Sequence, residues 1–250
     1  MVVFKQQLRR KTQGDPHFLV RTKNMELHTD FSQRVILHTE QMPWLPSPAA
    51  GVERRQLDRQ GEEVARATSI VRYASGSYFA AHTHGGGEEI LVLEGVFSDE
   101  HGHYPPGSYL RNLPGTTHTP FSEPGCVIFV KLWQFNPGDS QTICQQTGQG
   151  SWGPGRQEGI QIQLLHQFQG VRTVLMRLEP DLQVQLHSHP GGEEILVLEG
   201  NFADEHGEYS KGSWLRSPPG SSHSPKIGPN GALLYLKSGH LVAPVLPLPN

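Results

Sequence analysis

The sequence predicts an all-β protein made of two small barrels in tandem, and three observations support this fold class. The chain repeats itself once over most of its 250 residues. Short strand-like runs alternate with turns, and the chain holds 28 glycines and 20 prolines. No long stretch has helical periodicity, and short strands with Gly/Pro turns are typical of sandwiches and barrels.

Two phrases show the repeat most clearly. "HTHGGGEEILVLEG" at residues 82–95 returns as "HSHPGGEEILVLEG" at residues 187–200, a shift of 105 positions. Upstream, a shift of 108 aligns Trp44 with Trp152 and Leu57 with Leu165, so the second copy has lost three residues in a turn. Each copy is about 90 residues long, far longer than a solenoid unit, and can hold its own core.

The strands are expected at corresponding places in the two copies. The turn-forming phrases "EHGHYPPGS", "LPGTTH" and "PPGSSH" separate them. The boundaries that follow are a first barrel at 44–140, a linker rich in Gly, Gln and Ser at 141–151, and a second barrel at 152–250. The expected strands are 67–73, 77–84, 88–95 and 126–135 in the first copy, and 159–168, 172–178, 182–189, 193–200 and 232–238 in the second.

The two ends of the chain differ from the repeats. Residues 1–43 begin with the polar, basic stretch "KQQLRRKTQGD", which predicts a flexible tail, and "FSQRVILH" at 31–38 predicts an added edge strand. The closing "APVLPLPN" predicts a proline-rich tail that lies extended against the surface. Neither end carries a catalytic pattern.

Composition excludes several classes of partner. The net charge of −3 lacks the basic excess of nucleic-acid-binding proteins. The apolar runs "CVIFV" and "ILVL" are too short to cross a bilayer, and no signal-peptide core follows "MVVF", so we expect a cytoplasmic protein without membrane contacts. Cys126 and Cys144 are too few for a disulfide framework.

Three histidines and a glutamate of the first copy are expected to converge. His82 and His84 are two apart and therefore share one face of a strand. Glu88 follows a three-glycine turn at the start of the next strand, and His118 follows the turn "LPGTTH". Because unpaired imidazoles and carboxylates inside a barrel are costly, the set predicts a divalent-metal site with His82, His84, Glu88 and His118 as ligands.

The second copy repeats this ligand set, which predicts about one metal ion per barrel. Its members are His187, His189, Glu193 and His223. Neutral imidazole suits Zn, Fe, Ni or Cu, and the carboxylate extends the choice to Mn. A six-coordinate ion would keep two positions open for a ligand, whereas a tetrahedral zinc ion would be closed and structural. A net charge of about +1 would attract a small anionic or oxygen-bearing molecule.

At these residues the chain resembles the cupin superfamily, which implies two double-stranded β-helix (jelly-roll) barrels. The first cupin motif is met by Gly76, His82, His84, Glu88 and Gly95, and in the second copy Asp181 replaces the leading glycine. The second motif is met in the second copy by Gly212, Pro218, Gly220 and His223. In the first copy Leu113 replaces its proline, and both copies lack its final asparagine. These departures affect turns and leave all eight ligands in place.

The phrases "HTHGGGEEILVLEG", "SDEHG" and "PGTTHTPFSEPGC" resemble more narrowly the cupin domain of ChrR-type anti-sigma factors. In that family the same ligand set binds zinc and the domain takes part in sensing reactive oxygen, so the resemblance implies zinc, with Fe, Mn or Ni as alternatives. Those regulators also have a helical zinc-binding module that grips the sigma factor. No cysteine precedes residue 44 here, so we do not expect sigma-factor binding.

Two functions from different classes remain open. One is a non-catalytic metal-binding bicupin protein that senses an oxidant or a small ligand. The other is an iron-dependent dioxygenase that cleaves a small diketone- or enol-type substrate, for which no catalytic residue is assigned. The paired arginines Arg72/Arg177 and Arg111/Arg216 could clamp a carboxylate, but surface ion pairs are the favoured interpretation. Edge strands make a homodimer plausible.

Overall fold

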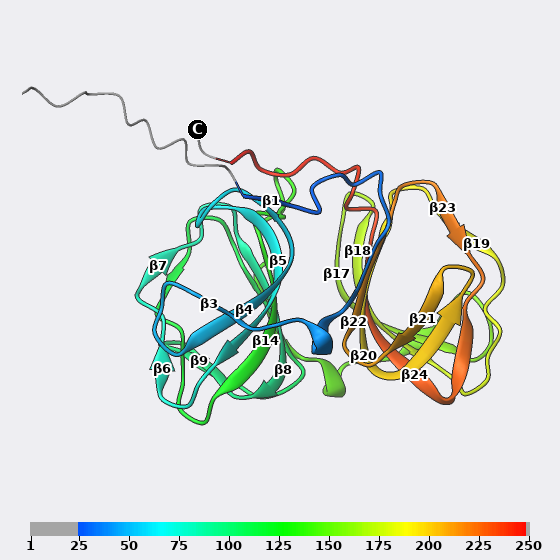
Figure 1. The fold of residues 1–250 in the computed structure, drawn as a ribbon, viewed down its shortest axis with the longest axis horizontal. Coiled ribbons are helices and arrows are strands. Elements are labelled where there is room, and N and C mark those ends of the chain that lie inside the picture. The colour runs from blue at the N-terminus through cyan, green and yellow to red at the C-terminus, as the bar shows by residue number, and fades with distance from the viewer. Residues whose placement is uncertain (1–24, 249–250) are drawn as a thin grey trace, which may run out of the picture.

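The computed structural model describes residues 25–248 and contains two β-barrels side by side, as Figure 1 shows. Almost all regular structure is strand; the exceptions are two short 3-10 helices, η1 (Thr39–Gln41) and η2 (Thr147–Gln149). The prediction of an all-β tandem-barrel fold is confirmed. None of the helices in residues 25–248 has the length and apolar character needed to span a bilayer. The basic stretch before residue 25 lies outside the described part of the chain.

The first barrel contains one large sheet and two small ones. The large sheet has the order β1-β4-β5-β14-β8-β11-β15, with β3 beside β4, and the small ones are β10-β9-β13-β6 and β12-β7. The bounds are β1 (Glu26–Leu27), β3 (Leu45–Pro46), β4 (Val52–Gln60), β5 (Arg66–Tyr73), β6 (Ser77–Tyr78), β7 (His82–Thr83), β8 (Glu88–Gly95), β9 (Phe97–Asp99), β10 (Gly102–Tyr104), β11 (Ser108–Asn112), β12 (Thr117–His118), β13 (Phe121–Ser122), β14 (Cys126–Leu132) and β15 (Ile143–Gln146).

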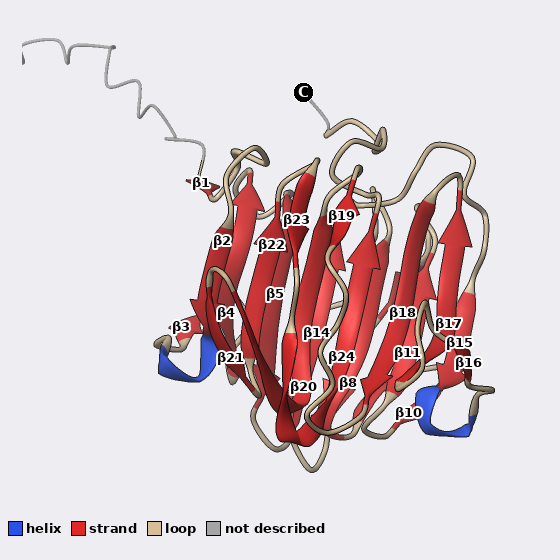
Figure 2. Cartoon of the chain, turned by 90° about the vertical axis from the view of Figure 1, so that its right-hand side faces the viewer, coloured by secondary structure: helices blue, strands red, loops and turns tan. Residues whose placement is uncertain are grey.

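The second barrel repeats this layout with fewer breaks. Its large sheet has the order β16-β17-β18-β24-β20-β22-β2, with β21 beside β20, and its small sheet is β19-β23. Figure 2 shows the long strands of both large sheets aligned side by side across the molecule. Neighbouring strands within each sheet are antiparallel. The bounds are β2 (Val35–His38), β16 (Gly153–Pro154), β17 (Ile160–Phe168), β18 (Val171–Leu178), β19 (His187–His189), β20 (Glu193–Asp204), β21 (Gly207–Ser210), β22 (Ser213–Ser217), β23 (Ser221–His223) and β24 (Lys226–Ser238).

Each barrel receives its last edge strand from the segment that precedes the other barrel. Strand β2, within the segment 31–38 where an edge strand was predicted, pairs with β22 of the second barrel. Strand β15 lies within the predicted linker 141–151 and pairs with β11 of the first barrel. Because each strand closes the sheet of the opposite half, the two barrels are tied together by backbone hydrogen bonds.

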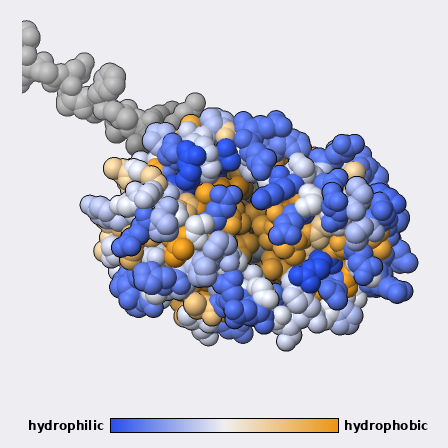
Figure 3. Space-filling view, turned by 90° about the horizontal axis from the view of Figure 1, so that it is seen from below, coloured by the Kyte–Doolittle hydropathy of each residue, from blue (hydrophilic) through white to orange (hydrophobic). Residues whose placement is uncertain are grey.

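The facing sheets of the two barrels share one apolar core. It joins Leu91, Tyr109 and Phe129 of the first barrel to Trp214 and Tyr235 of the second. Each barrel also has an interior core of its own, centred on β8 and β14 in one half and on β20 and β24 in the other. Seen from below, apolar residues gather in a hollow at the middle of the molecule (Figure 3).

Two buried lysine–glutamate pairs cross this shared core. Lys131 Nζ lies 2.6 Å from Glu194 Oε1, and Lys237 Nζ lies 2.6 Å from Glu89 Oε2. The two pairs are equivalent by the repeat. Lys131 on β14 of the first barrel reaches Glu194 of the second, and Lys237 on β24 of the second barrel reaches Glu89 of the first. Trp214 Nε1 donates a further hydrogen bond to Glu194. The interface is therefore specified by charge as well as by apolar contact.

Removal of one partner from such a pair should be costly. We expect Lys131→Ala to lower the free energy of unfolding by about 3–5 kcal/mol, because the Glu194 carboxylate would stay buried without its main cation. Urea unfolding followed by tryptophan fluorescence measures this loss. The matched control is Arg54→Ala, whose partner Glu63 is 62% exposed and whose removal should cost under about 1 kcal/mol. An equal loss of unfolding free energy in Lys131→Ala and Arg54→Ala would contradict the structural role given to the buried Lys131–Glu194 pair.

The interface should also lose stability in mild acid. Burial lowers the pKa of His240 to about 4, against the opposing effect of the neighbouring Glu194. The unfolded chain then binds the proton more readily than the native one, so stability is intact above about pH 6.5 and falls by about 3 kcal/mol as the pH drops to about 4. Urea titrations across this range should show a shallower fall for His240→Gln; identical profiles would refute the linkage.

Candidate metal centres

The ligand residues of the first barrel are gathered at one end by a short strand pair and a glycine turn. Strand β7 pairs with β12 so that His82 lies opposite His118. The turn at residues 85–87 then carries the chain from His84 to Glu88 at the start of β8. A Cβ on Gly86 would lie 2.1 Å from the Trp133 ring, so the turn requires glycine to pass beneath the indole.

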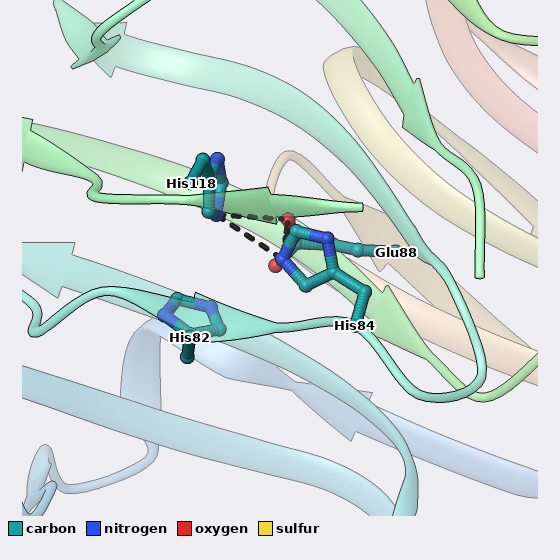
Figure 4. Close-up of side chains that lie close together, drawn as sticks. All are labelled: His82, His84, Glu88 and His118. Carbon is teal, nitrogen blue, oxygen red and sulfur yellow. Dashed lines mark hydrogen bonds and ion pairs between the residues drawn. The ribbon is translucent and has the colours of Figure 1, made fainter. Parts of the chain in front are cut away.

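The four predicted ligands of this barrel come together, as Figure 4 shows. One donor atom from each of His82, His84, Glu88 and His118 lies within 4.8 Å of the other three. Glu88 Oε2 is 3.2 Å from His84 Nε2 and 3.6 Å from His118 Nε2. The two Nε2 atoms are 3.2 Å apart. Two nitrogens bound to one ion by bonds of about 2.1 Å would be separated by about 3 Å, so the spacing suits a shared cation.

The protonation of the rings supports the same conclusion. His118 donates its Nδ1 proton to Asp99 Oδ2 at 3.2 Å. His84 Nδ1 lies 3.1 Å from Thr116 Oγ1, whose own proton is given to the Leu113 carbonyl, so the ring is the donor. Both Nε2 atoms therefore present lone pairs to each other and need a cation between them. His82 is held in the same tautomer by the Ala80 carbonyl.

The second barrel has the same arrangement with a wider spacing of its carboxylate. Donor atoms of His187, His189 and His223 all lie within 4.8 Å of one another, whereas Glu193 falls outside this limit. Its Oε2 nevertheless lies 3.4 Å from His189 Nε2 and 3.6 Å from His223 Nε2. That oxygen is buried and has no hydrogen-bond partner in residues 25–248. An unpaired buried carboxylate oxygen beside three imidazoles is what a fourth metal ligand would look like without its ion.

Burial sets the charge of the second site. It raises the pKa of Glu193 to about 7, against the opposing effects of His223 and nearby arginines. It also lowers the pKa of His189 to about 3. Burial therefore keeps the His189 imidazole neutral and destabilises a bare Glu193 carboxylate. A divalent cation would relieve that destabilisation, because it compensates the carboxylate charge directly.

Two aspartates complete the sites, and the sequence analysis missed them. His223 donates its Nδ1 proton to Asp204 Oδ2 at 2.9 Å, and His118 bonds Asp99 in the same way. Each aspartate is fixed by a tyrosine hydroxyl, Tyr104 in one barrel and Tyr209 in the other. A signal was available, since "DEHG" occurs in both copies. These carboxylates orient the ring and make its other nitrogen a better ligand.

The glutamates beside the ligands face away from the metal sites. Glu89 and Glu194 are buried in the contact between the barrels, because the alternation of side chains along a strand, which the sequence predicts, turns them to the side opposite Glu88 and Glu193. Arg111 is bound there as well, with its Nη2 2.8 Å from Asp139 Oδ2. Arg216 bonds Asp58 across the interface.

The expectation of surface ion pairs was right for Arg72 and wrong for Arg111 and Arg216, whereas Arg177 stacks on Trp152. Arg72 pairs with Glu53 at the surface and stacks on Trp44. Arg111 and Arg216, however, are 2% and 0% exposed. They were misjudged because their partners come from distant segments that the sequence does not place. Both stabilise the interface and neither lines a metal site.

A cavity adjoins the second site. It has a volume of about 480 Å³ and reaches from the ligand histidines into the barrel interior. Its walls are mostly apolar, with Ile162, Val174, Met176 and Phe202 among them. A further hollow of about 540 Å³ lies between the barrels, bordered by Trp44, Leu93 and Leu198.

Comparison with known families and structures agrees with this geometry. The family model described as ChrR Cupin-like domain matches the chain twice, at residues 32–136 and 140–242. No curated protein matches the chain in sequence. Both matched ranges begin just before an exchanged edge strand, β2 in the first and β15 in the second.

Solved structures share the fold at low sequence identity. A candidate dioxygenase from Nostoc punctiforme is 17% identical with a TM-score of 0.69, and 88% of each chain is covered. A candidate glyoxylate-induced protein from Pseudomonas aeruginosa is 13% identical with a TM-score of 0.67, over 93% of this chain and 95% of that one. A bacterial pirin from Escherichia coli in complex with nickel(II) is 13% identical with a TM-score of 0.60, over 82% and 99%.

Loss of an orienting aspartate should weaken metal binding without unfolding the barrel. We expect Asp204→Asn to reduce the metal affinity of the second site by about 10–100-fold, because the amide no longer stabilises the Nδ1–H tautomer of His223. Competition with a chromophoric chelator measures the affinity. Glu208→Gln, an exposed acid on β21, is the matched control and should leave it unchanged. An unaltered affinity in Asp204→Asn would contradict this role.

Proposed function

Because the chain belongs to the ChrR cupin-like domain family, with one copy in each half, we propose that it is a metal-binding bicupin protein holding one divalent ion per barrel. The observation that carries this proposal is the convergence of three imidazoles and one carboxylate in each barrel, with ring protons directed outward to fixed acceptors. Rings held in this tautomer direct their Nε2 lone pairs at a common point.

Zinc is the metal we propose for both sites, by resemblance to ChrR-type cupin domains. The ligands would be His82, His84, Glu88 and His118 in the first barrel, and His187, His189, Glu193 and His223 in the second. Nitrogen and carboxylate donors of this kind also accept Fe, Mn or Ni. A bound divalent ion supplies a Lewis-acidic centre that attracts an anion and acidifies coordinated water.

The role proposed for these ions is the sensing of an oxidant or a small ligand. His187 and His189 are only partly buried, and the adjoining cavity offers a route from solvent to the ion. Cys126 is a poor candidate for the responding group, because burial raises the pKa of its thiol to about 11 and so suppresses the reactive thiolate. The metal ligands are therefore the proposed site of the response.

An iron-dependent dioxygenase is the second candidate. The observation that favours it is the cavity of about 480 Å³ beside the second ligand set, which has room for a small chelating substrate. The residues that line it supply apolar walls that would exclude water from such a substrate. The first site has no assigned part in this alternative beyond stabilising its barrel.

Metal identity and stoichiometry separate the two functions. We expect about two zinc ions per chain by elemental analysis, about one in each of the variants His82→Ala and His187→Ala, and only trace metal when both are combined. Each ligand removed leaves the other barrel intact, since the sites share no residue.

Two outcomes decide between the candidates. Iron in place of zinc, together with oxygen uptake on small diketones or enols that is lost in His187→Ala, would replace the sensor proposal with the enzyme. Trace metal in the wild-type protein, with no gain in thermal stability on adding Zn²⁺, Fe²⁺ or Ni²⁺, would refute metal binding altogether.

A further inference from the structure

The interiors of the two barrels differ although their metal ligands are the same. The cavity of the second barrel is lined by Leu178 and Val184. The corresponding positions of the first barrel carry the larger side chains Tyr73 and Phe79. Tyr73 is 6% exposed and its ring packs 5.9 Å from that of Phe97, inside the first barrel. The aromatic pair has larger side chains than the aliphatic pair at the same positions of the repeat.

The sheet wall that carries the candidate ligand glutamate differs between the barrels as well. In the second barrel, Arg172 lies opposite Ser238 on the neighbouring strand, and Ser238 lies opposite Glu193. The three residues form one row across β18, β24 and β20. In a row of three strands the outer two backbones are about 10 Å apart, and Arg172 and Glu193 line the same cavity.

The same row of the first barrel is apolar apart from its ligand. Ala67 lies opposite Leu132, and Leu132 opposite Glu88. Alanine and leucine thus replace the arginine and serine of the second barrel. Arg54 of the first barrel is bound at 2.9 Å by the exposed Glu63.

Arg172 faces the cavity without a bound anion partner. It lines the cavity together with Ser238, and its Nε is buried with no hydrogen-bond partner in residues 25–248. The other arginine of this strand, Arg177, faces outward and stacks on Trp152 at 4.2 Å. The buried Nε–H of Arg172 needs an acceptor, because a desolvated N–H group is otherwise unsatisfied.

Other positive charge surrounds this site. Arg156 also lines the cavity, and Arg34 bonds Ser217, which lies directly opposite Glu193 in the sheet. The equivalent residues of the first barrel are Pro48 and Thr142. Three arginines therefore surround the second site at positions where the first barrel has Ala67, Pro48 and Thr142.

We propose that only the second barrel binds an organic ligand, and that this ligand is a small monocarboxylate with an apolar body. Its carboxylate would lie between the metal ion and Arg172, and its apolar part would fill the space beside Leu178 and Val184. This inference rests on the proposed metal site of the second barrel. A neutral ligand would leave Arg172 unpaired, and a phosphate group without an apolar part would leave the cavity walls hydrated.

Octanoate is a suitable probe, used on protein loaded with Co²⁺ in the His82→Ala background, where only the second site binds metal. We expect one octanoate per chain by isothermal titration, with a change in the visible Co²⁺ spectrum. Arg172→Ala should weaken binding by about 10–100-fold and leave the Co²⁺ content unchanged. Arg177→Ala, on the same strand but facing outward, is the matched control and should bind as the parent does.

A second variant tests the cavity separately from the charge. Val184→Phe introduces the residue of the first barrel at this position and should abolish octanoate binding while Co²⁺ loading persists. Equal affinity for octanoate and octanol, or undiminished binding in Arg172→Ala, would overturn the inference. Normal Co²⁺ loading without octanoate binding would refute this inference alone, whereas absence of Co²⁺ from the second barrel would refute the proposed metal site.

Discussion

The alternation of side chains along two identical strands is the constraint on which this molecule depends. In the segment "EEILVLEG" of each half, the first glutamate faces the barrel interior and the second faces the other barrel. One strand therefore supplies a candidate metal ligand, Glu88, and an interface anion, Glu89. A register slip of one residue would exchange these roles and leave each carboxylate without its partner.

Residues of the interface and residues of the candidate metal sites are consequently neighbours in the chain. Lys237, which binds Glu89 of the first barrel, is followed by Ser238, which lies beside Glu193 of the second. Buried ion pairs of this kind add little net stability but penalise any other docking of the halves strongly. Together with the exchanged edge strands, they fix the orientation of two barrels that could each form a core alone.

Duplication has preserved the ligands and allowed the surroundings to differ. Both halves retain three histidines, a glutamate and an orienting aspartate, and the proposal of one cation in each interior rests on this shared set. The wall residues have no such geometric requirement. Exchange of Tyr73 and Phe79 for Leu178 and Val184 changes barrel volume, and exchange of Ala67 for Arg172 changes its charge. The same set of candidate ligands therefore lies beside interior walls that differ in side-chain size and charge.

Sequence alone determined the tandem all-β fold, and it predicted the gathering of the eight candidate ligands and the outward facing of Glu89 and Glu194, because a strand alternates with a period of two and turns have local signals. Only the tertiary structure decided that β2 and β15 close the opposite barrels, that Asp99 and Asp204 orient His118 and His223, and that Arg111 and Arg216 are buried. These three features depend on which distant segments of the chain meet. Sheet pairing joins residues up to about 180 positions apart, and no local sequence pattern encodes such partners.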